Sequence, residues 1–321
     1  MSLASFLAAV LLLSGAQQAS QRSQADDFPT AELESILVEG RRLEEAARAY
    51  AQEVGEPPRG TRLARWNRPV CVSVSNMQPR FAQFMIDRIS ANALDAGADI
   101  GGPGCRPNVI ILATTDGPVL AKKLVREAGL GFRPAIQHTN LTRDALSEFQ
   151  NAASPVRWWN VVMPVTADTG DIATVLQGDS VLVEGTVDEY RLLRVRDSSR
   201  IRSNIRYDMA WTIVIIDMGK TGGAPFGVLA DYVSMVSLAQ IDPDADLSGQ
   251  STVMNLFRSS GPIDGLSQWD KDYLAALYTA PNDRVSASQQ EKGVIRSMVR
   301  ERQEREGEAT PVVVLPTNEA P

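Results

Sequence analysis

The stretch 209–278 constrains the fold more than any other part of the sequence, because it sets four elements in a fixed order. The apolar run 209–216 predicts a strand, and the apolar spacing of 226–240 predicts a helix. A loop over 252–255, which contains Met254, follows, and a closing helix is predicted over 267–278. These elements predict a mixed α/β (α+β) domain with the helix 226–240 at its centre.

A strand–helix–strand unit precedes this stretch. Residues 70–75 alternate between valine and small residues, as in a strand, and a second strand is predicted over 108–113. The helix predicted between them, over 80–95, has an apolar stripe that Arg88 interrupts near its edge. A helix that joins two strands predicts a parallel pair and a right-handed crossover.

The rest of the chain divides around the main domain. Residues 1–16 are interpreted as a signal peptide, 17–59 as a polar leader and a helix over 30–54, 60–280 as the main domain, and 281–321 as a tail that is helical over 288–305 and then disordered. Within the main domain we further predict helices over 117–129 and 143–150, a strand around 158–163, and extended segments over 180–187, 189–196 and 200–207. Trp158 and Trp159 are neighbours in a predicted strand, so they should point to opposite faces, one of them into the core.

The first residues predict export. The apolar run 3–13 is too short to span a bilayer, and residues 14–16 are small, as a signal peptidase requires. The chain has two cysteines, Cys71 and Cys105, which in an exported protein predict one disulfide, with two buried thiols as the alternative. Closing that loop would stabilise the fold by about 3–4 kcal/mol. We therefore expect a periplasmic or extracellular protein.

The net charge argues against one class of function. The chain carries a formal net charge of −7, whereas a nucleic-acid binder needs a basic face. No later segment is apolar for long enough to cross a membrane. An enzyme, a binding protein and a structural protein remain as candidates.

The helix predicted over 226–240 matches part of a zinc-binding pattern. In H-E-x-x-H, two histidines one turn apart reach one zinc ion and the glutamate activates its water. The best superposition places Ala230 and Ser234 at the histidine positions and Asp231 at the acid, with Ser237 where a small residue often follows. The single histidine, His138, lies far away in the sequence. One carboxylate cannot supply the ligands that zinc needs, so we predict no metal and no cofactor.

Three short motifs surround this degenerate helix. The pattern R-W-x-x-P-V-x-V begins at Arg65, and the pattern S-[IV]-[MF]-N is approximated by 252–255. The pattern L-[ST]-x-[WY]-D-x-x-x-L-x-x-L-Y runs from Leu266 to Tyr278. Over residues 65–278 the chain thereby resembles a family of predicted secreted, zincin-like bacterial proteins of unknown function, whose members carry a degenerate H-E-x-x-H helix. The chain departs from that family at Ser234, where its relatives often have glutamine.

The resemblance implies a zincin-like mixed sheet with an active-site-type helix, a turn containing Met254 and a closing helix. The favoured hypothesis is an exported, non-catalytic metallopeptidase-like protein that binds a peptide or a cell-envelope partner. Two alternatives stay open: an active hydrolase with atypical ligands that uses Asp231, and a purely structural envelope protein. No oligomeric state is predicted.

A basic segment offers a second candidate binding site. Within 191–206 lie six arginines: Arg191, Arg194, Arg196, Arg200, Arg202 and Arg206. Arg194 with Arg196, and Arg200 with Arg202, have strand alternation, which would aim each pair at one face for binding carboxylates or phosphates. The alternative is an exposed hairpin whose arginines pair with nearby acids and discourage edge pairing.

Two further patterns are weak. Asp242, Asp244 and Asp246 resemble the start of a calcium loop, but Leu247 and Val253 stand where glycine and glutamate are required. Residues 219–221 (Gly-Lys-Thr) resemble the end of a phosphate-binding loop, but its first glycine is missing. We therefore interpret both segments as polar turns.

Overall fold

The computed structural model describes residues 30–55, 57, 61–134, 141–174, 193–194, 200–258 and 261–309. The chain forms two units, Met1–Leu43 and Glu44–Pro321, and the fold below is that of the second unit. The signal peptide predicted over 1–16, His138, and most of the extended segments predicted over 180–196 lie outside the described residues, as does the tail after Ala309. Among the helices of the described residues, none is both long and apolar enough to cross a membrane.

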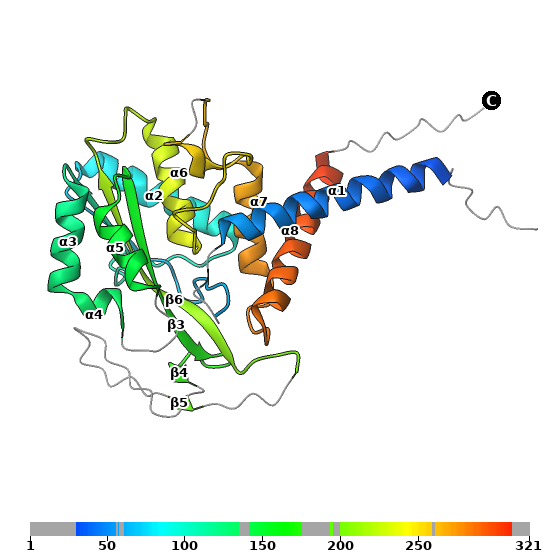
Figure 1. Cartoon of the computed structure of the whole chain (residues 1–321), viewed down its shortest axis with the longest axis horizontal. Helices are drawn as coiled ribbons and strands as arrows, with labels where there is room; N and C mark the ends of the chain where they lie inside the picture. The colour runs from blue at the N-terminus through cyan, green and yellow to red at the C-terminus, as the bar shows by residue number, and fades with distance from the viewer. Residues whose placement is uncertain are drawn as a thin grey trace, which may run out of the picture. The chain divides into compact units, whose positions relative to one another are not determined.

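A four-stranded mixed sheet forms the centre of this unit (Figure 1). Its order is β1 (Val72–Ser75), β2 (Val109–Thr114), β6 (Ile205–Asp217) and β3 (Val156–Thr166). The pairs β1–β2 and β2–β6 are parallel, and β3 is antiparallel to β6. The predicted parallel strand–helix–strand unit is therefore confirmed. The mixed α/β class is confirmed as well, with eight helices in the described residues.

Helices cover both faces of the sheet (Figure 1). On one face the core includes residues from α2 (Pro79–Ala96), α6 (Phe226–Leu238) and α7 (Gln268–Thr279). On the other it includes residues from α3 (Gly117–Glu127), α4 (Gly129–Phe132) and α5 (Arg143–Asn151). Alternate residues of one strand enter different cores, because successive side chains point to opposite faces of a sheet.

The tryptophan pair of β3 follows this alternation. Trp159 is buried among the residues of α4 and α5, and its Nε1 donates to the carbonyl of Phe132 at 2.7 Å. Trp158 is half-buried on the other face and packs edge-on against Tyr232 of α6, with ring centroids 6.1 Å apart. The prediction that the two rings lie on opposite faces is confirmed.

The strands β4 (Ala173–Thr174) and β5 (Leu193–Arg194) form a separate parallel pair. β5 belongs to the extended segment predicted over 189–196; the other residues of that segment and of the segment predicted over 180–187 lie outside the described residues. Both flanking parts of the chain also join the main core. The last turns of α1 (Thr30–Val54) bury Tyr50 and Val54 there, and α8 (Ala287–Ala309) buries Ile295 and Met298. The core of this unit thus includes residues of both flanking helices.

The disulfide between Cys71 and Cys105 is present, as predicted. The two Cα atoms lie 6.1 Å apart. Both cysteines lie just before strands, Cys71 before β1 and Cys105 a few residues before β2, so the bond ties the starts of two paired strands together.

Two side chains in the segment before β1 cap the C-terminal ends of two helices. Arg65 Nη1 donates to the carbonyls of Leu277, Tyr278 and Ala280 at 2.8, 2.5 and 2.9 Å, where α7 ends. The neighbouring Trp66 donates from Nε1 to the carbonyl of Ser237 at 2.8 Å, where α6 ends. Carbonyls at helix C-termini lack partners inside the helix, so these donors satisfy them. The Arg-Trp pair of the first motif therefore has a structural role.

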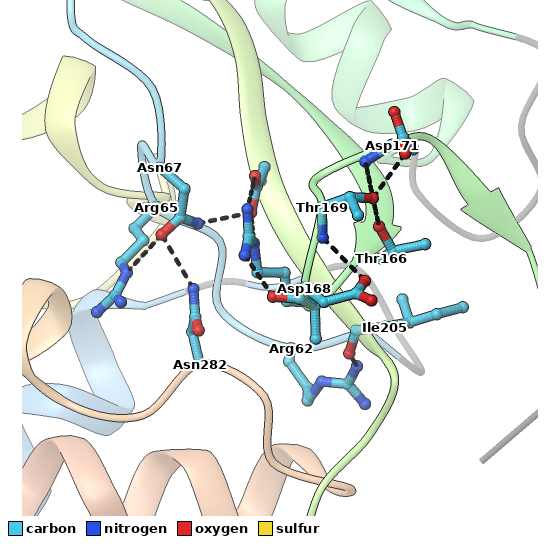
Figure 2. Close-up of polar contacts among 12 residues, drawn as sticks. Arg62, Arg65, Asn67, Thr166, Asp168, Thr169, Asp171, Ile205 and Asn282 are labelled. Carbon is cyan, nitrogen blue, oxygen red and sulfur yellow. Dashed lines mark hydrogen bonds and ion pairs between the residues drawn. The ribbon is translucent and has the colours of Figure 1, made fainter. Parts of the chain in front are cut away.

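A polar cluster extends this capping segment toward the start of β6 (Figure 2). Asn67 Nδ2 donates to Asp208 Oδ1 at 2.6 Å, and Asn67 Oδ1 accepts from Arg65 Nε and from Asn282 at 3.2 Å each. Arg206 forms an ion pair with the same Asp208 at 2.9 Å. One of the six arginines of the basic segment is thus part of the internal structure.

A buried carboxylate joins the other two motifs. Asp270 of α7 accepts hydrogen bonds from Tyr50 Oη (2.5 Å), Thr252 Oγ1 (2.6 Å), and the amides of Val253 (2.8 Å) and Ser267 (2.7 Å). Ser267 returns a bond to the amide of Asp270, which completes a capping box. Burial and then the Asp270 charge raise the pKa of Tyr50 well above its usual value, so its hydroxyl remains a donor. The closing helix thereby holds η1 (Val253–Asn255), the predicted methionine turn, in place.

We predict that Asp270→Asn destabilises the protein by about 2–4 kcal/mol, because an amide offers N–H groups where buried donors need acceptors. Urea unfolding followed by circular dichroism measures the loss. The exposed Asp87→Asn on α2 serves as the control and should stay close to wild type. An Asp270→Asn variant as stable as this control would contradict the role given to Asp270.

Candidate functional site

The acid of the degenerate pattern, Asp231, is fully buried and has a cation partner. Arg88 of α2 binds it through two hydrogen bonds, from Nε to Oδ1 at 2.6 Å and from Nη2 to Oδ2 at 2.7 Å. Such a bidentate contact is the strongest geometry available to a carboxylate. The interruption of the apolar stripe by Arg88 was the sequence signal for this partner.

Ser234, at the second histidine position of the pattern, contacts α2 as well. Asn92 Nδ2 donates to Asp231 Oδ1 at 2.8 Å and to Ser234 Oγ at 2.9 Å. Ser234 Oγ in turn donates to the carbonyl of Ala230 at 2.8 Å. Ala230, Ser234 and Ser237 are all completely buried. Asp231 and Ser234 therefore form a polar contact between α6 and α2, and both oxygens of Asp231 accept hydrogen bonds.

The loop before α7 closes over Asp231. Gly265 has a φ of +139°, and a Cβ atom there would lie 2.5 Å from Asp231 Oδ2. A side chain at this position would clash with the carboxylate and strain the backbone. Only glycine fits without displacing the Arg88–Asp231 pair.

Gly265→Ala should therefore lower the free energy of unfolding by about 1–3 kcal/mol. Gly249→Ala is the matched control, because a Cβ there meets no atom within 4 Å. Thermal unfolding of the two variants measures the difference. Equal stabilities would show that the loop does not press on Asp231.

The face of α6 that points to β3 carries different residues. Tyr232 packs against Trp158 and against Phe257, whose ring centroid lies 5.3 Å from its own. The carbonyl of Val236 accepts a bond from Asn160 Nδ2 of β3 at 3.1 Å. Adjacent residues of a helix are about 100° apart around its axis, so Tyr232 and Asp231 face different neighbours. The acid of the H-E-x-x-H superposition, Asp231, thus faces α2, whereas Tyr232, at an unspecified position of the pattern, faces β3.

A cleft of about 460 Å³, here called the β3-edge slot, lies where β3 meets these residues. One wall comes from α5 and the segment that follows it, and the other from α6 and the segment 240–258. The methionine turn contributes Met254, which is otherwise buried beside α6. The aromatic and thioether side chains that line the slot are Phe149, Trp158, Trp159, Tyr232, Met254 and Phe257.

The backbone of β3 is directed into this slot. The amide of Asp217 donates to the carbonyl of Pro155 at 2.8 Å, which makes these two residues a hydrogen-bonded pair at the start of the β3–β6 ladder. Hydrogen-bonded and non-bonded pairs alternate in antiparallel strands, so Trp158 and Asn160 point their N–H and C=O groups away from β6. Among the described strands, only β6 pairs with β3 in the sheet, which makes this outer side an edge.

The basic segment is only partly described. Arg200 and Arg202 are exposed, and Arg202 lies 3.7 Å from Asp283. The backbone of Arg194 belongs to β5, and Arg196 lies outside the described residues. Arg206 is bound to Asp208, as described above. Within the described residues, Arg200 and Arg202 are the one exposed pair of the predicted basic face.

The other acidic and glycine-rich segments make local contacts within their own turns. Asp242 Oδ1 accepts from the amide of Asp244 at 2.8 Å, and Asp246 Oδ1 accepts from Ser248 Oγ at 2.7 Å. Lys220 lies 3.3 Å from Asp217, beside a cavity of about 560 Å³ that shares Pro155 and Phe257 with the β3-edge slot. Across the residues with assigned positions, no three histidine, cysteine or acidic side chains are grouped so that they could hold a metal ion.

Asp217 is the acid whose protonation should matter for stability. Burial opposes its charge, but hydrogen bonds from the Gly117 amide (3.1 Å) and Lys220 outweigh this, and the pKa of Asp217 lies below its usual value. A lowered folded-state pKa stabilises above the unfolded-state pKa, and the gain disappears as the pH falls through the folded-state pKa.

We therefore predict that Asp217→Asn is destabilised most above about pH 5, and that its difference from wild type shrinks below about pH 4. Urea unfolding of both proteins across this range measures the difference. A difference that does not change with pH would contradict this role for Asp217.

Comparisons with protein-family models, with curated proteins and with solved structures find no match to this chain. The functional interpretation therefore depends on the geometry described above. Sequence reasoning found few of the residues that line the slot, among them Trp158, Trp159, Asp244 and Met254. The pair Trp158–Trp159 was the available signal, since two large aromatic residues side by side on a strand must serve two different surfaces.

Proposed function

We propose that the protein is an exported, non-catalytic metallopeptidase-like protein that binds an extended peptide along the outer edge of β3. The observation that carries this proposal is the β3-edge slot itself. It combines outward-facing backbone groups on Trp158 and Asn160 with two apolar walls. A peptide that adds a strand to a sheet edge gains main-chain hydrogen bonds for affinity and side-chain pockets for specificity.

The residues around the slot support binding rather than hydrolysis. The α6 side chain that faces the slot is Tyr232, and the neighbouring polar groups of β3 and the following loop are the amides of Asn160 and Gln240. Two acids, Glu148 and Asp244, line it from opposite walls, which offers fewer ligands than a zinc site needs. Asp231 lies against α2 with both oxygens bonded, so it is poorly placed to act as a general base.

The layout supports the metallopeptidase-like part of the proposal. An antiparallel edge strand runs beside a buried helix, and a methionine turn lies against that helix. The resemblance of residues 65–278 implies a central helix with a turn containing Met254 beside it, and these elements support that part of the proposal. The apolar leader in the sequence and the disulfide support export, and hence a peptide or a segment of a cell-envelope protein as the partner.

A pair of substitutions at Trp158 tests the role of the backbone. Trp158→Ala and Trp158→Pro both remove the ring, but only proline also removes the outward N–H, and proline is tolerated on an edge strand. Peptides are selected from a phage-displayed library of random decapeptides, and their affinities for each variant are measured by fluorescence polarisation. We expect Trp158→Pro to bind about tenfold more weakly than Trp158→Ala, the value of one lost hydrogen bond.

Equal affinities for the two Trp158 variants, with both folded by thermal unfolding, would contradict strand addition at this edge. The same peptides also test catalysis. Cleavage of a bound peptide by the wild-type protein that Asp231→Asn abolishes, in a variant that remains folded, would favour the hydrolase alternative instead.

A further inference from the structure

We infer that the β3-edge slot binds a segment of a second copy of this chain, namely residues 311–316 (Pro-Val-Val-Val-Leu-Pro). This inference rests on the proposed function and names the peptide that the slot accepts. Three observations lead to it: the two-sided apolar character of the slot, its length, and the position at which α8 ends.

A strand added to β3 in the slot would be covered on both faces. On one side lie Leu141, Ala145 and Phe149, the last two of them on α5. On the other lie Tyr232 and Phe257. Strands buried on both faces consist of continuous apolar runs, whereas strands with one solvent-exposed face alternate between apolar and polar residues. The slot therefore selects an uninterrupted apolar segment over an amphipathic one.

The slot accepts only a short strand. The carbonyl of Val156, which also points outward, already accepts a bond from Ser154 Oγ at 2.6 Å. The outward groups of Trp158 and Asn160 remain to pair with an incoming strand, and they span three residues of β3. A partner strand of three or four residues is enough to meet them, because residues facing one direction recur every second position.

The chain itself contains a segment with these properties. Residues 312–315 are Val-Val-Val-Leu, an uncharged run of residues that favour strands. Pro311 and Pro316 bound the run on both sides. Proline has no N–H to donate, so this strand could extend no further than four residues. The absence of charge also suits the slot, because its charged lining residues are two acids, Glu148 and Asp244, and two arginines, Arg157 and Arg258, which leave no net charge to attract a charged segment.

The position of α8 assigns this segment to a second copy. α8 ends at Ala309 and packs against α7, and Figure 1 places its end on the opposite side of the unit from α5, with α6 and α7 between them. Three residues reach at most about 10 Å, so Val312 cannot pass from Ala309 around these helices to the slot of its own chain. A second copy has no such restriction.

Sedimentation velocity over a range of protein concentrations tests the inference. We expect the full chain to associate as its concentration rises, and Val313→Lys to associate at least about tenfold more weakly. Thr317→Lys adds the same charge outside the apolar run and should associate like wild type. Trp158→Pro should lose association as Val313→Lys does, because one removes the binding edge and the other the strand that binds it.

A mixing experiment separates this mechanism from other contacts. Val313→Lys retains an intact slot and Trp158→Pro retains an intact segment, so an equimolar mixture should form a one-to-one dimer although neither variant associates alone. No recovery in the mixture, or full association of Val313→Lys, would overturn the inference. A wild-type chain that stays monomeric, yet binds library peptides in a way that Trp158→Pro weakens, would also overturn it while the proposed function stands.

Discussion

The fold depends on how α6 accommodates a charge in its buried centre. Every residue from Val228 to Leu238 is buried, and Asp231 lies in the middle of that run. An unpaired carboxylate in such a place would cost several kcal/mol, so the helix has to present Asp231 to a cation. Arg88 supplies it from α2, and Gly265 leaves room for the pair. This contact sets the rotation of α6 and thereby turns Tyr232 toward β3, where the slot forms.

A second buried carboxylate fixes the surroundings of the slot. Asp270 binds the methionine turn, the cap of α7 and Tyr50 of α1 at once. Met254 and Phe257, which line the slot, are therefore held by residues that are distant in sequence. The two motifs most specific to the family resemblance, the methionine turn and the closing helix, are joined by this one side chain. Their joint presence has a structural reason that does not require catalysis.

Local patterns predicted much of the architecture. The helix expected over 30–54 has those bounds, the parallel pair β1–β2 follows from a helix between two strands, and Ser267 begins the closing helix through its side chain. The orientation of α6 was not predictable in the same way. A helix that is apolar on all sides has no distinguishable face, so matching letters to H-E-x-x-H could not show that Asp231 points to α2.

The position of β3 at the edge of the sheet could not be predicted from the sequence either. It depends on a long-range antiparallel pairing with β6, whose register shifts after Val161.

Amide hydrogen exchange of β3, measured with and without a saturating library-selected peptide, tests strand addition most directly. Strand addition should slow exchange at Trp158 and Asn160, whose amides face outward, and leave Trp159 unchanged, because its amide is bonded to β6. Protection elsewhere on the protein, with Trp158 and Asn160 unchanged, would contradict it.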